Sequence, residues 1–215
     1  MAARLASVNV GRPSVVGMRR GRPVHSAIGK APVERRVRVE GVNLGGDDQA
    51  DRRLHGGPDK AVYAYAFEDI AWWAQELDRE LGPGAFGENL TTEGVDVSGA
   101  VVGERWQVGD ALLEVAQPRL PCFKLGLKFE DPTMLKRFTL ASRPGAYLRI
   151  VEEGELGAGD AIEVFGRPDH GVTVALVADA IQLDETLLRD VLAATQLPGE
   201  LYRWLERRAD PGPVP

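Results

Sequence analysis

Short runs in which hydrophobic and polar residues alternate dominate the chain from its N-terminus to about residue 160. Ala6, Val8 and Val10 alternate with polar residues, and Val37 and Val39 do the same. A period of two bounded by glycine or proline is typical of β-strands. Residues 61–67 also alternate, with aliphatic side chains on one face and aromatic side chains on the other. The pattern predicts a mainly β, barrel-like domain.

Two segments inside this region have a helical period instead. Apolar residues recur at helical spacing over residues 68–81, directly before Gly82-Pro83. Asp131-Pro132 is typical of a helix N-terminus, and it predicts a second helix that ends near residue 143.

The chain changes character after residue 166. Residues 184–195 and 199–208 have the pattern of short helices, whereas residues 172–180 fit either a strand or a helix. We therefore predict an α+β protein: a mainly β, barrel-like domain with inserted helices (1–166), then a small all-α domain (167–209). Residues 210–215 are rich in proline and glycine and are expected to be disordered.

Composition and charge exclude several classes of protein. The net charge of the 215 residues is −6, which argues against a general nucleic-acid binder. The charge is uneven, because residues 1–40 carry +7 and the rest −13; the basic segment could form an anion site or a solvated surface. No apolar run could span a membrane or serve as a signal peptide. A single cysteine without an export signal predicts a cytoplasmic location.

Several familiar motifs are absent or misplaced. Residues 82–87 fit G-x-G-x-x-G, but they follow a predicted helix, whereas a dinucleotide site requires a strand before the glycines. The chain has no phosphate-binding P-loop motif and no G-x-S-x-G motif. One cysteine and three histidines show no zinc-ligand spacing.

The only cysteine, Cys122, lies within residues 117–124 between two prolines and two cations. Proline fixes φ and removes a backbone donor, so we expect a stiff loop here, neither a regular helix nor a central strand. A lone thiol is either a packed apolar residue or a reactive group. Arg119 and Lys124 favour the thiolate, which is both nucleophile and metal ligand.

A second candidate segment is glycine-rich and runs from Gly46 to Lys60. Adjacent glycines such as Gly56 and Gly57 let backbone N–H groups approach an anion. His55 and Lys60 could add polar contacts beside them. The alternative is a solvated loop in which Lys60 forms a salt bridge.

These two segments belong to a series that, in order along the chain, resembles the MOSC proteins. That family is named after the C-terminal domain of molybdenum cofactor sulfurase. The resemblance is to the stand-alone bacterial branch linked to resistance against N-hydroxylated purines. The matching segments are residues 26–33, 46–51, 55–62, 86–91, 109–110, 117–124, 145–149 and 159–160, together with Trp73. The tail also resembles the three-helix domain that follows MOSC in this branch.

The resemblance implies a β-barrel whose cleft binds the molybdenum cofactor, with Cys122 as the ligand of molybdenum. A thiolate suits a redox-active transition metal, and the phosphate of the cofactor suits cations and glycine N–H groups. Asn89 and Arg149 could instead pin a loop or pair with an acid. The tryptophan pair and two tyrosines, Trp72, Trp73, Tyr63 and Tyr65, are interpreted as core rather than cavity lining. The matched polar and glycine positions that would contact the cofactor are Ser26, Lys30, His55, Gly56, Gly57, Lys60, Asn89, Arg119, Lys124 and Arg149.

The function implied is a molybdenum-dependent oxidoreductase that reduces N-hydroxylated compounds, such as hydroxylamino bases or amidoximes, to amines. Cys122 would be the catalytic metal ligand, and His55 or Lys60 would donate protons. The chain has no flavin, haem or iron–sulfur signature, so a separate flavin- or iron–sulfur-containing reductase is expected to supply electrons. A homodimer is compatible with the sequence. One alternative is a non-catalytic carrier of the cofactor, or of sulfur as a Cys122 persulfide. A pyridoxal phosphate site at Lys60 is a further, disfavoured alternative.

Overall fold

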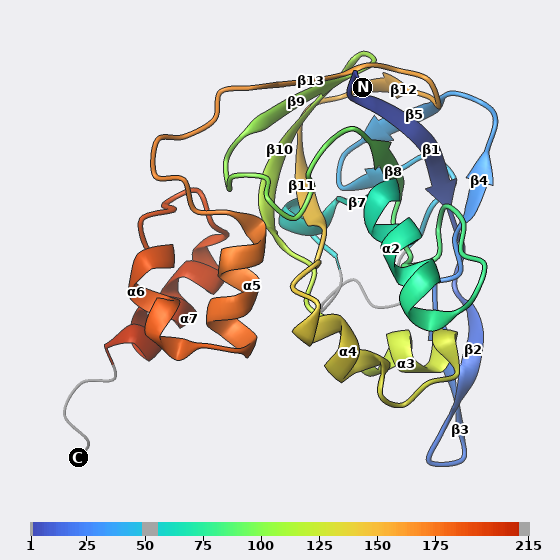
Figure 1. Ribbon diagram of the computed structural model, residues 1–215. Helices are drawn as coiled ribbons and strands as arrows, with labels where there is room; N and C mark the ends of the chain where they lie inside the picture. Colours follow the sequence, from blue (N-terminus) through green and yellow to red (C-terminus); the bar gives the residue numbers. More distant parts are fainter. Residues whose placement is uncertain (1, 49–55, 211–215) are drawn as a thin grey trace.

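The computed structural model describes residues 2–48 and 56–210, and it is a mixed α/β fold organised around one large sheet (Figure 1). His55 lies outside these residues, so its predicted role is not addressed by the structure. The strands of the sheet, in spatial order, are β13 (Ile162–Phe165), β9 (Arg105–Val108), β10 (Ala111–Pro118), β11 (Ala146–Glu152), β7 (Val62–Ala66), β8 (Leu90–Glu93), β1 (Arg4–Val10) and β4 (Ala31–Val33).

Neighbouring strands of this sheet are antiparallel except β7 and β8, which are parallel. A parallel pair needs a crossover connection, and helix α2 (Phe67–Leu77) supplies part of it. β7 is central and buried on both faces, as its alternating aliphatic and aromatic residues predict.

The sheet curves strongly, so that strand β1 approaches the start of β13. Backbone hydrogen bonds join Leu5 N to Asp160 O and Ile162 N to Ala3 O, both at 2.8–3.0 Å. The ladder between described residues nonetheless has two ends, β13 and β4. A closed barrel is therefore not confirmed, although the sheet is bent in that direction.

Two smaller sheets complete the β structure. The first pairs β12 (Gly154–Leu156), β5 (Val37–Glu40) and β6 (Asn43–Leu44). The second is a hairpin of β2 (Ser14–Arg19) and β3 (Arg22–Ser26), which projects from the body of the molecule (Figure 1).

The predicted helices form with shifted ends. Helix α2 stops at Leu77 rather than residue 81, because Asp78 is left-handed (φ 48°) and caps the last carbonyls. The second helix, α4 (Met134–Leu140), starts after Asp131-Pro132, because the Asp131 carboxylate accepts hydrogen bonds from Thr133 and holds a turn there.

The prediction that residues 117–124 form neither a helix nor a central strand is wrong at both ends. Strand β10 continues to Pro118, and helix α3 (Phe123–Phe129) begins directly after Cys122. Proline is tolerated at Pro118 because it is the final residue of the strand. Only residues 119–122 form the expected loop.

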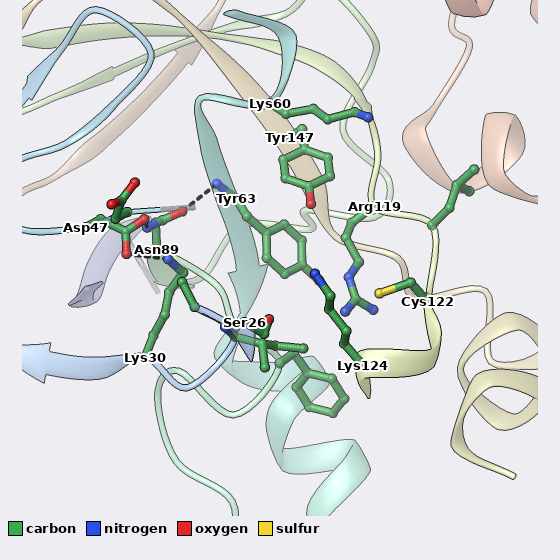
Figure 2. Close-up of a pocket in the computed structure, with 16 residues that line it drawn as sticks. Ser26, Lys30, Asp47, Lys60, Tyr63, Asn89, Arg119, Cys122, Lys124 and Tyr147 are labelled. Atoms are coloured by element: carbon green, nitrogen blue, oxygen red, sulfur yellow. Dashed lines mark hydrogen bonds and ion pairs between the residues drawn. The ribbon is translucent and has the colours of Figure 1, made fainter. Parts of the chain in front are cut away.

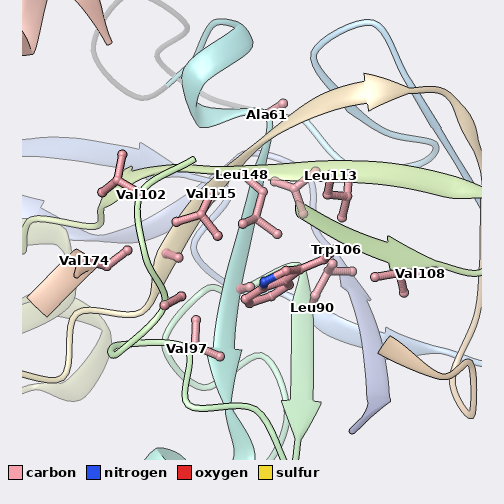
Figure 3. Packing of buried hydrophobic residues seen from close by; sticks show 14 of the residues in the cluster. Ala61, Leu90, Val97, Val102, Trp106, Val108, Leu113, Val115, Leu148 and Val174 are labelled. Carbon is pink, nitrogen blue, oxygen red and sulfur yellow. The ribbon is translucent and has the colours of Figure 1, made fainter. Parts of the chain in front are cut away.

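The C-terminal residues fold as helices α5 (Val174–Gln182), α6 (Leu188–Val191) and α7 (Gly199–Ala209), with a 3₁₀ turn, η2 (Glu185–Leu187). Residues 172–180 are thus mainly helical. These helices share one apolar core with the sheet (Figure 3): Val174 and Val177 pack in the same cluster as Trp106. Backbone bonds from Val102 N to Val172 O and from Val174 N to Ala100 O join the two parts. A separate all-α appendage is therefore not confirmed.

A second apolar cluster lies on the other side of β7. Its buried aromatic side chains come from β7, α2, α3, α4 and the loop before β8: Tyr63, Tyr65, Trp73, Phe86, Phe129 and Phe138. The cluster confirms Trp73 and Tyr65 as core residues. No helix among the described residues is long and apolar enough to cross a bilayer.

Candidate functional site

A cavity of about 100 Å³, open to solvent, lies at the edge of this aromatic cluster (Figure 2). Four cationic side chains line it from four different segments: Lys30, Lys60, Arg119 and Lys124. Its other polar lining residues are Ser26, Asp47, Asp48, Asn89, Cys122 and Tyr147. Apolar atoms of the Ile28, Tyr63, Phe86 and Leu120 side chains complete the wall.

The loop between β10 and α3 brings Arg119 and Cys122 to this cavity. Figure 2 shows the guanidinium of Arg119 and the sulfur of Cys122 both turned into the open space. Cys122 is a half-buried free thiol in an extended conformation (φ −127°, ψ 166°), one residue before the helix. Its sulfur is thus exposed to the cavity rather than packed in the aliphatic core.

Arg119 is the most unusual charged residue of the site. Only 5% of it is exposed, and its buried Nη1 atom has no hydrogen-bond partner among the described residues. Its guanidinium lies 5.8 Å from the ring centre of Tyr63 and 5.1 Å from that of Phe138. Aromatic faces attract a cation, but they do not replace a hydrogen-bond acceptor. A buried cation in this state has a donor that an anion could accept from.

Lys30 is paired, unlike Arg119. Its ammonium lies 2.5 Å from the Asp47 carboxylate, and both side chains are almost completely buried. Burial lowers the pKa of Lys30, although the charge and hydrogen bond of Asp47 oppose that shift. Asp47 also accepts hydrogen bonds from Gly11 N (2.8 Å) and from the Asn89 amide (2.9 Å). Lys30 therefore forms part of a fixed wall.

Asn89 lines the cavity, but its side chain forms hydrogen bonds with other residues of the protein. Its side-chain oxygen accepts from Tyr63 N (3.1 Å), and its amide donates to Asp47 and Asn9 O. This is the loop-pinning arrangement left open by the sequence. The hydroxyl oxygen of Ser26 accepts from Ile28 N (3.2 Å) and fixes the turn beside it.

Arg149 lies outside the cavity lining. Its guanidinium donates to Asp59 (2.5 Å), Glu114 (2.9 Å) and the Gln196 carbonyl (2.9 Å). The pairing with acids, which the sequence left as an alternative, is the one seen. Gly56 and Gly57 are also not lining residues; Gly57 (φ 95°) precedes the 3₁₀ turn η1 (Pro58–Lys60) that carries Lys60 to the cavity.

The sequence analysis did not identify two groups behind the cavity, the partly buried Lys128 and the buried Glu88. Lys128 donates to Ile28 O (2.8 Å) and Gly84 O (2.6 Å), and so ties two lining segments together. Burial lowers its pKa to about 8, with Arg119 and Lys30 acting in the same direction and Glu88 opposing them. Glu88 accepts from Gly84 N, Phe86 N and the Thr91 hydroxyl, and burial raises its pKa.

The misplaced glycine motif has a structural explanation in the same region. Gly84 (φ 83°) and Gly87 (φ 80°) lie directly against residues 28–30. A Cβ at Gly84 would lie 2.6 Å from Lys30 O, and one at Gly87 would lie 2.7 Å from Ile28 Cγ1. These glycines serve close packing of the cavity wall rather than a dinucleotide phosphate.

Two tyrosines also reach the cavity. The hydroxyl of Tyr63 donates to Pro144 O (3.0 Å), whereas that of Tyr147 points into the open space (Figure 2). Burial raises the pKa of Tyr147, and nearby Arg119 partly opposes the shift. Tyr63 is thus both core and lining. Tyr147 alternates with buried residues of β11, and this pattern is the sequence signal that could have identified it.

No group of three or more His, Cys, Asp or Glu side chains able to hold a metal occurs in the described part of the chain. A metal at Cys122 would therefore have to bring most of its ligands with it. A cofactor that chelates its own metal meets this requirement.

Comparison with known proteins gives the family to which the chain belongs. The model of the MOSC domain family matches residues 51–163. YflK of Bacillus subtilis, described only as uncharacterized, is 36% identical over 168 residues, which is 78% of this chain and 76% of YflK. The chain therefore belongs to the MOSC family.

Two further similarities cover more of the chain or name an activity. The crystal structure of YiiM from Geobacillus stearothermophilus superposes with a TM-score of 0.78 and 26% identity, over 97% of this chain and all of that one. A protein of Gibberella moniliformis named "Reductase" is 34% identical over 182 residues, which is 83% of this chain but only 32% of that protein.

Proposed function

We propose that this protein is a molybdenum-cofactor-dependent oxidoreductase that reduces N-hydroxylated compounds to amines. The observation that carries the proposal is the juxtaposition, in one open cavity, of a free thiol, Cys122, with the buried Nη1 of Arg119, which has no hydrogen-bond partner among the described residues. The MOSC family and the relative named "Reductase" support the same class of chemistry.

The residues present fit the cofactor. Arg119 offers a buried donor without an acceptor in the described chain, as an anionic phosphate requires. Lys60 and Lys124 line the same cavity from η1 and α3. Cys122 offers the soft sulfur ligand that molybdenum favours. Cys122 would hold the metal, Arg119 with Lys60 and Lys124 would hold the phosphate, and Lys30, fixed by Asp47, would form the wall beside them.

The reaction consumes two electrons and two protons per N–O bond broken, and it releases water and the dehydroxylated product, which is an amine from a hydroxylamine and an amidine from an amidoxime. The bound cofactor would supply the two-electron redox chemistry. The protein would orient the substrate against the Tyr63, Phe86 and Tyr147 rings. His55 or Lys60 would donate protons; Lys60 lines the cavity, and His55 lies outside the described residues.

The test is metal content and turnover of protein from a host that makes the cofactor. We expect stoichiometric molybdenum by plasma mass spectrometry, and reduction of an amidoxime driven by reduced viologen. Cys122→Ser retains the size of the side chain but removes the soft ligand, so it should lose molybdenum and activity together while its Tm is preserved. Wild-type protein from a host unable to make the cofactor is the control.

Two outcomes contradict the proposal. If wild-type protein from the competent host contained no metal, the proposal that it binds the cofactor would be refuted. Labile sulfur on Cys122 without turnover would favour the sulfur carrier considered above.

A further inference from the structure

An apolar groove lies beside the cavity, between the β2–β3 hairpin and helices α3 and α4. We call it the hairpin groove. Its main lining residues are Val16, Gly17, Arg19, Phe123, Leu127 and Leu135. The β2 strand continues the apolar surface outward, because Val15 and Met18 are 56% and 59% exposed. An exposed apolar surface of this kind on a polar body marks an interaction site.

The hairpin beside the groove is strongly basic. The hairpin contains three arginines, Arg19, Arg20 and Arg22, and no acidic residue, and a fourth arginine, Arg12, lies just before it. Three of these arginines, Arg12, Arg20 and Arg22, are exposed and form no ion pair within residues 2–48 and 56–210. The remaining one, Arg19, lies 4.1 Å from the ring centre of Phe123. The rest of the chain is acidic, with −13 beyond residue 40.

The groove and the cavity share one structural element. Phe123 lines the groove, whereas its neighbours Cys122 and Lys124 line the cavity. The floor of the groove is therefore one peptide bond from the thiol. A molecule seated in the groove would contact the residue that directly follows Cys122.

We infer that the hairpin groove is the docking site of an acidic electron-donor protein. This inference rests on the proposed function, which needs two electrons per turnover and a donor outside the described fold. Charge complementarity selects the partner: an acidic surface is repelled by most of this molecule and attracted by the hairpin arginines. The apolar centre at Val16 and Leu127 supplies the buried contact that charge alone does not provide.

The far rim of the groove carries two acids, Glu130 and Asp131. Asp131 is engaged with Thr133 and with Arg137 at 3.7 Å, so it adds little free charge. The rim is thus basic on the hairpin side and mildly acidic on the helix side. This asymmetry fixes the orientation in which an acidic partner binds.

The test uses a flavodoxin, a small acidic flavoprotein that donates one electron at a time, as the probe. Met18→Glu/Arg22→Glu replaces an exposed apolar and an exposed basic residue of the hairpin, neither of which lines the cavity. Leu183→Glu/Arg203→Glu makes the same two changes on exposed residues of the C-terminal helices, distant from the hairpin in Figure 1. Molybdenum content, viologen-driven rate, flavodoxin-driven rate and affinity for oxidised flavodoxin are measured for all three proteins.

We expect the flavodoxin-driven rate and the affinity of the hairpin variant to fall by about tenfold at low salt, as the loss of electrostatic steering and of one apolar contact requires. Its viologen-driven rate and molybdenum content should match those of the wild type, and the control variant should match throughout. Equal flavodoxin rates and affinities in hairpin and control variants, or a wild type that does not bind flavodoxin, would overturn the docking site. If the wild type showed no viologen-driven rate, the proposed function would be refuted instead. The docking site would then still be decided by the affinities of the three proteins for oxidised flavodoxin.

Discussion

Replacement of Arg119 by methionine should raise the stability of the ligand-free protein. Methionine preserves the length of the apolar stem against Tyr63 and Phe138 but removes the buried charge. Most substitutions of a buried residue destabilise a protein, so a rise is a demanding prediction. It follows from the buried Nη1 atom of Arg119, which has no hydrogen-bond partner in the described part of the chain.

The magnitude can be worked out from the contacts. A buried polar group without a partner costs about 1–3 kcal/mol in the free energy of unfolding. The two ring contacts at 5.8 and 5.1 Å offset about 0.5–1 kcal/mol each. With about 2 kcal/mol for the unpartnered group and about 1.5 kcal/mol for the two ring contacts, Arg119→Met should gain about 0.5 kcal/mol, which is about 1–2 °C in Tm for a chain of this size.

The matched control is Arg149→Met. Arg149 donates to Asp59, Glu114 and Gln196 O, so the same substitution removes three satisfied contacts. Because these partners are partly exposed, we expect a loss of about 1–2 kcal/mol and a lower Tm. Two arginine-to-methionine substitutions should thus shift Tm in opposite directions.

The assay is thermal unfolding of cofactor-free protein while inorganic phosphate is titrated. An anion that binds only the folded state stabilises it by about 2.7 kcal/mol at one hundred times its Kd. Wild type and Arg149→Met should gain Tm with phosphate, and Arg119→Met should not. If Arg119→Met is as damaging as Arg149→Met and responds equally to phosphate, the cavity is not an anion site and the reasoning fails.

Two predictions concern the wall behind the cavity. Lys128 has a pKa of about 8 in the folded protein, against an ordinary value of 10.5. Between these pH values the unfolded chain therefore binds more protons than the folded protein. The contribution of Lys128 to stability consequently rises with pH across that window. Chemical unfolding at several pH values should show the free energy of unfolding of the wild type rising, relative to that of Lys128→Met, from pH 8 upward. A relative fall contradicts the assignment. Gly87→Ala should cost more than 2 kcal/mol, because its Cβ meets Ile28 at 2.7 Å, whereas Gly159→Ala, with positive φ but open space, should cost about 1 kcal/mol. Equal losses in urea unfolding would show that the clash is relieved.

The strands could be predicted from the sequence where alternation was clean. Val37 and Val39 are buried in β5, and residues 62–66 form β7. Strand β1 was harder, since a bulge between Leu5 and Ser7 changes which residues face inward. The parallel β7–β8 pair could not be predicted, because pairing depends on contacts between segments distant in sequence.

The site could be predicted as a set of residue types but not as a set of roles. Lys30, Lys60, Arg119 and Lys124 do line one cavity with Cys122. The sequence could not separate the unpartnered Arg119 from the paired Arg149, since charge satisfaction depends on tertiary neighbours. For the same reason nothing in the sequence distinguished Lys128, whose acceptors are backbone carbonyls of two distant loops.

The three contacts of Arg149 connect parts of the molecule that otherwise have separate tasks. Asp59 is the neighbour of Lys60 on the cavity rim, and Gln196 belongs to the helical C-terminal region. A change in how those helices pack would therefore reach the rim through a single side chain. Exchange of the C-terminal helices between relatives could therefore shift the position of Lys60 on the rim without altering any residue that faces the cavity.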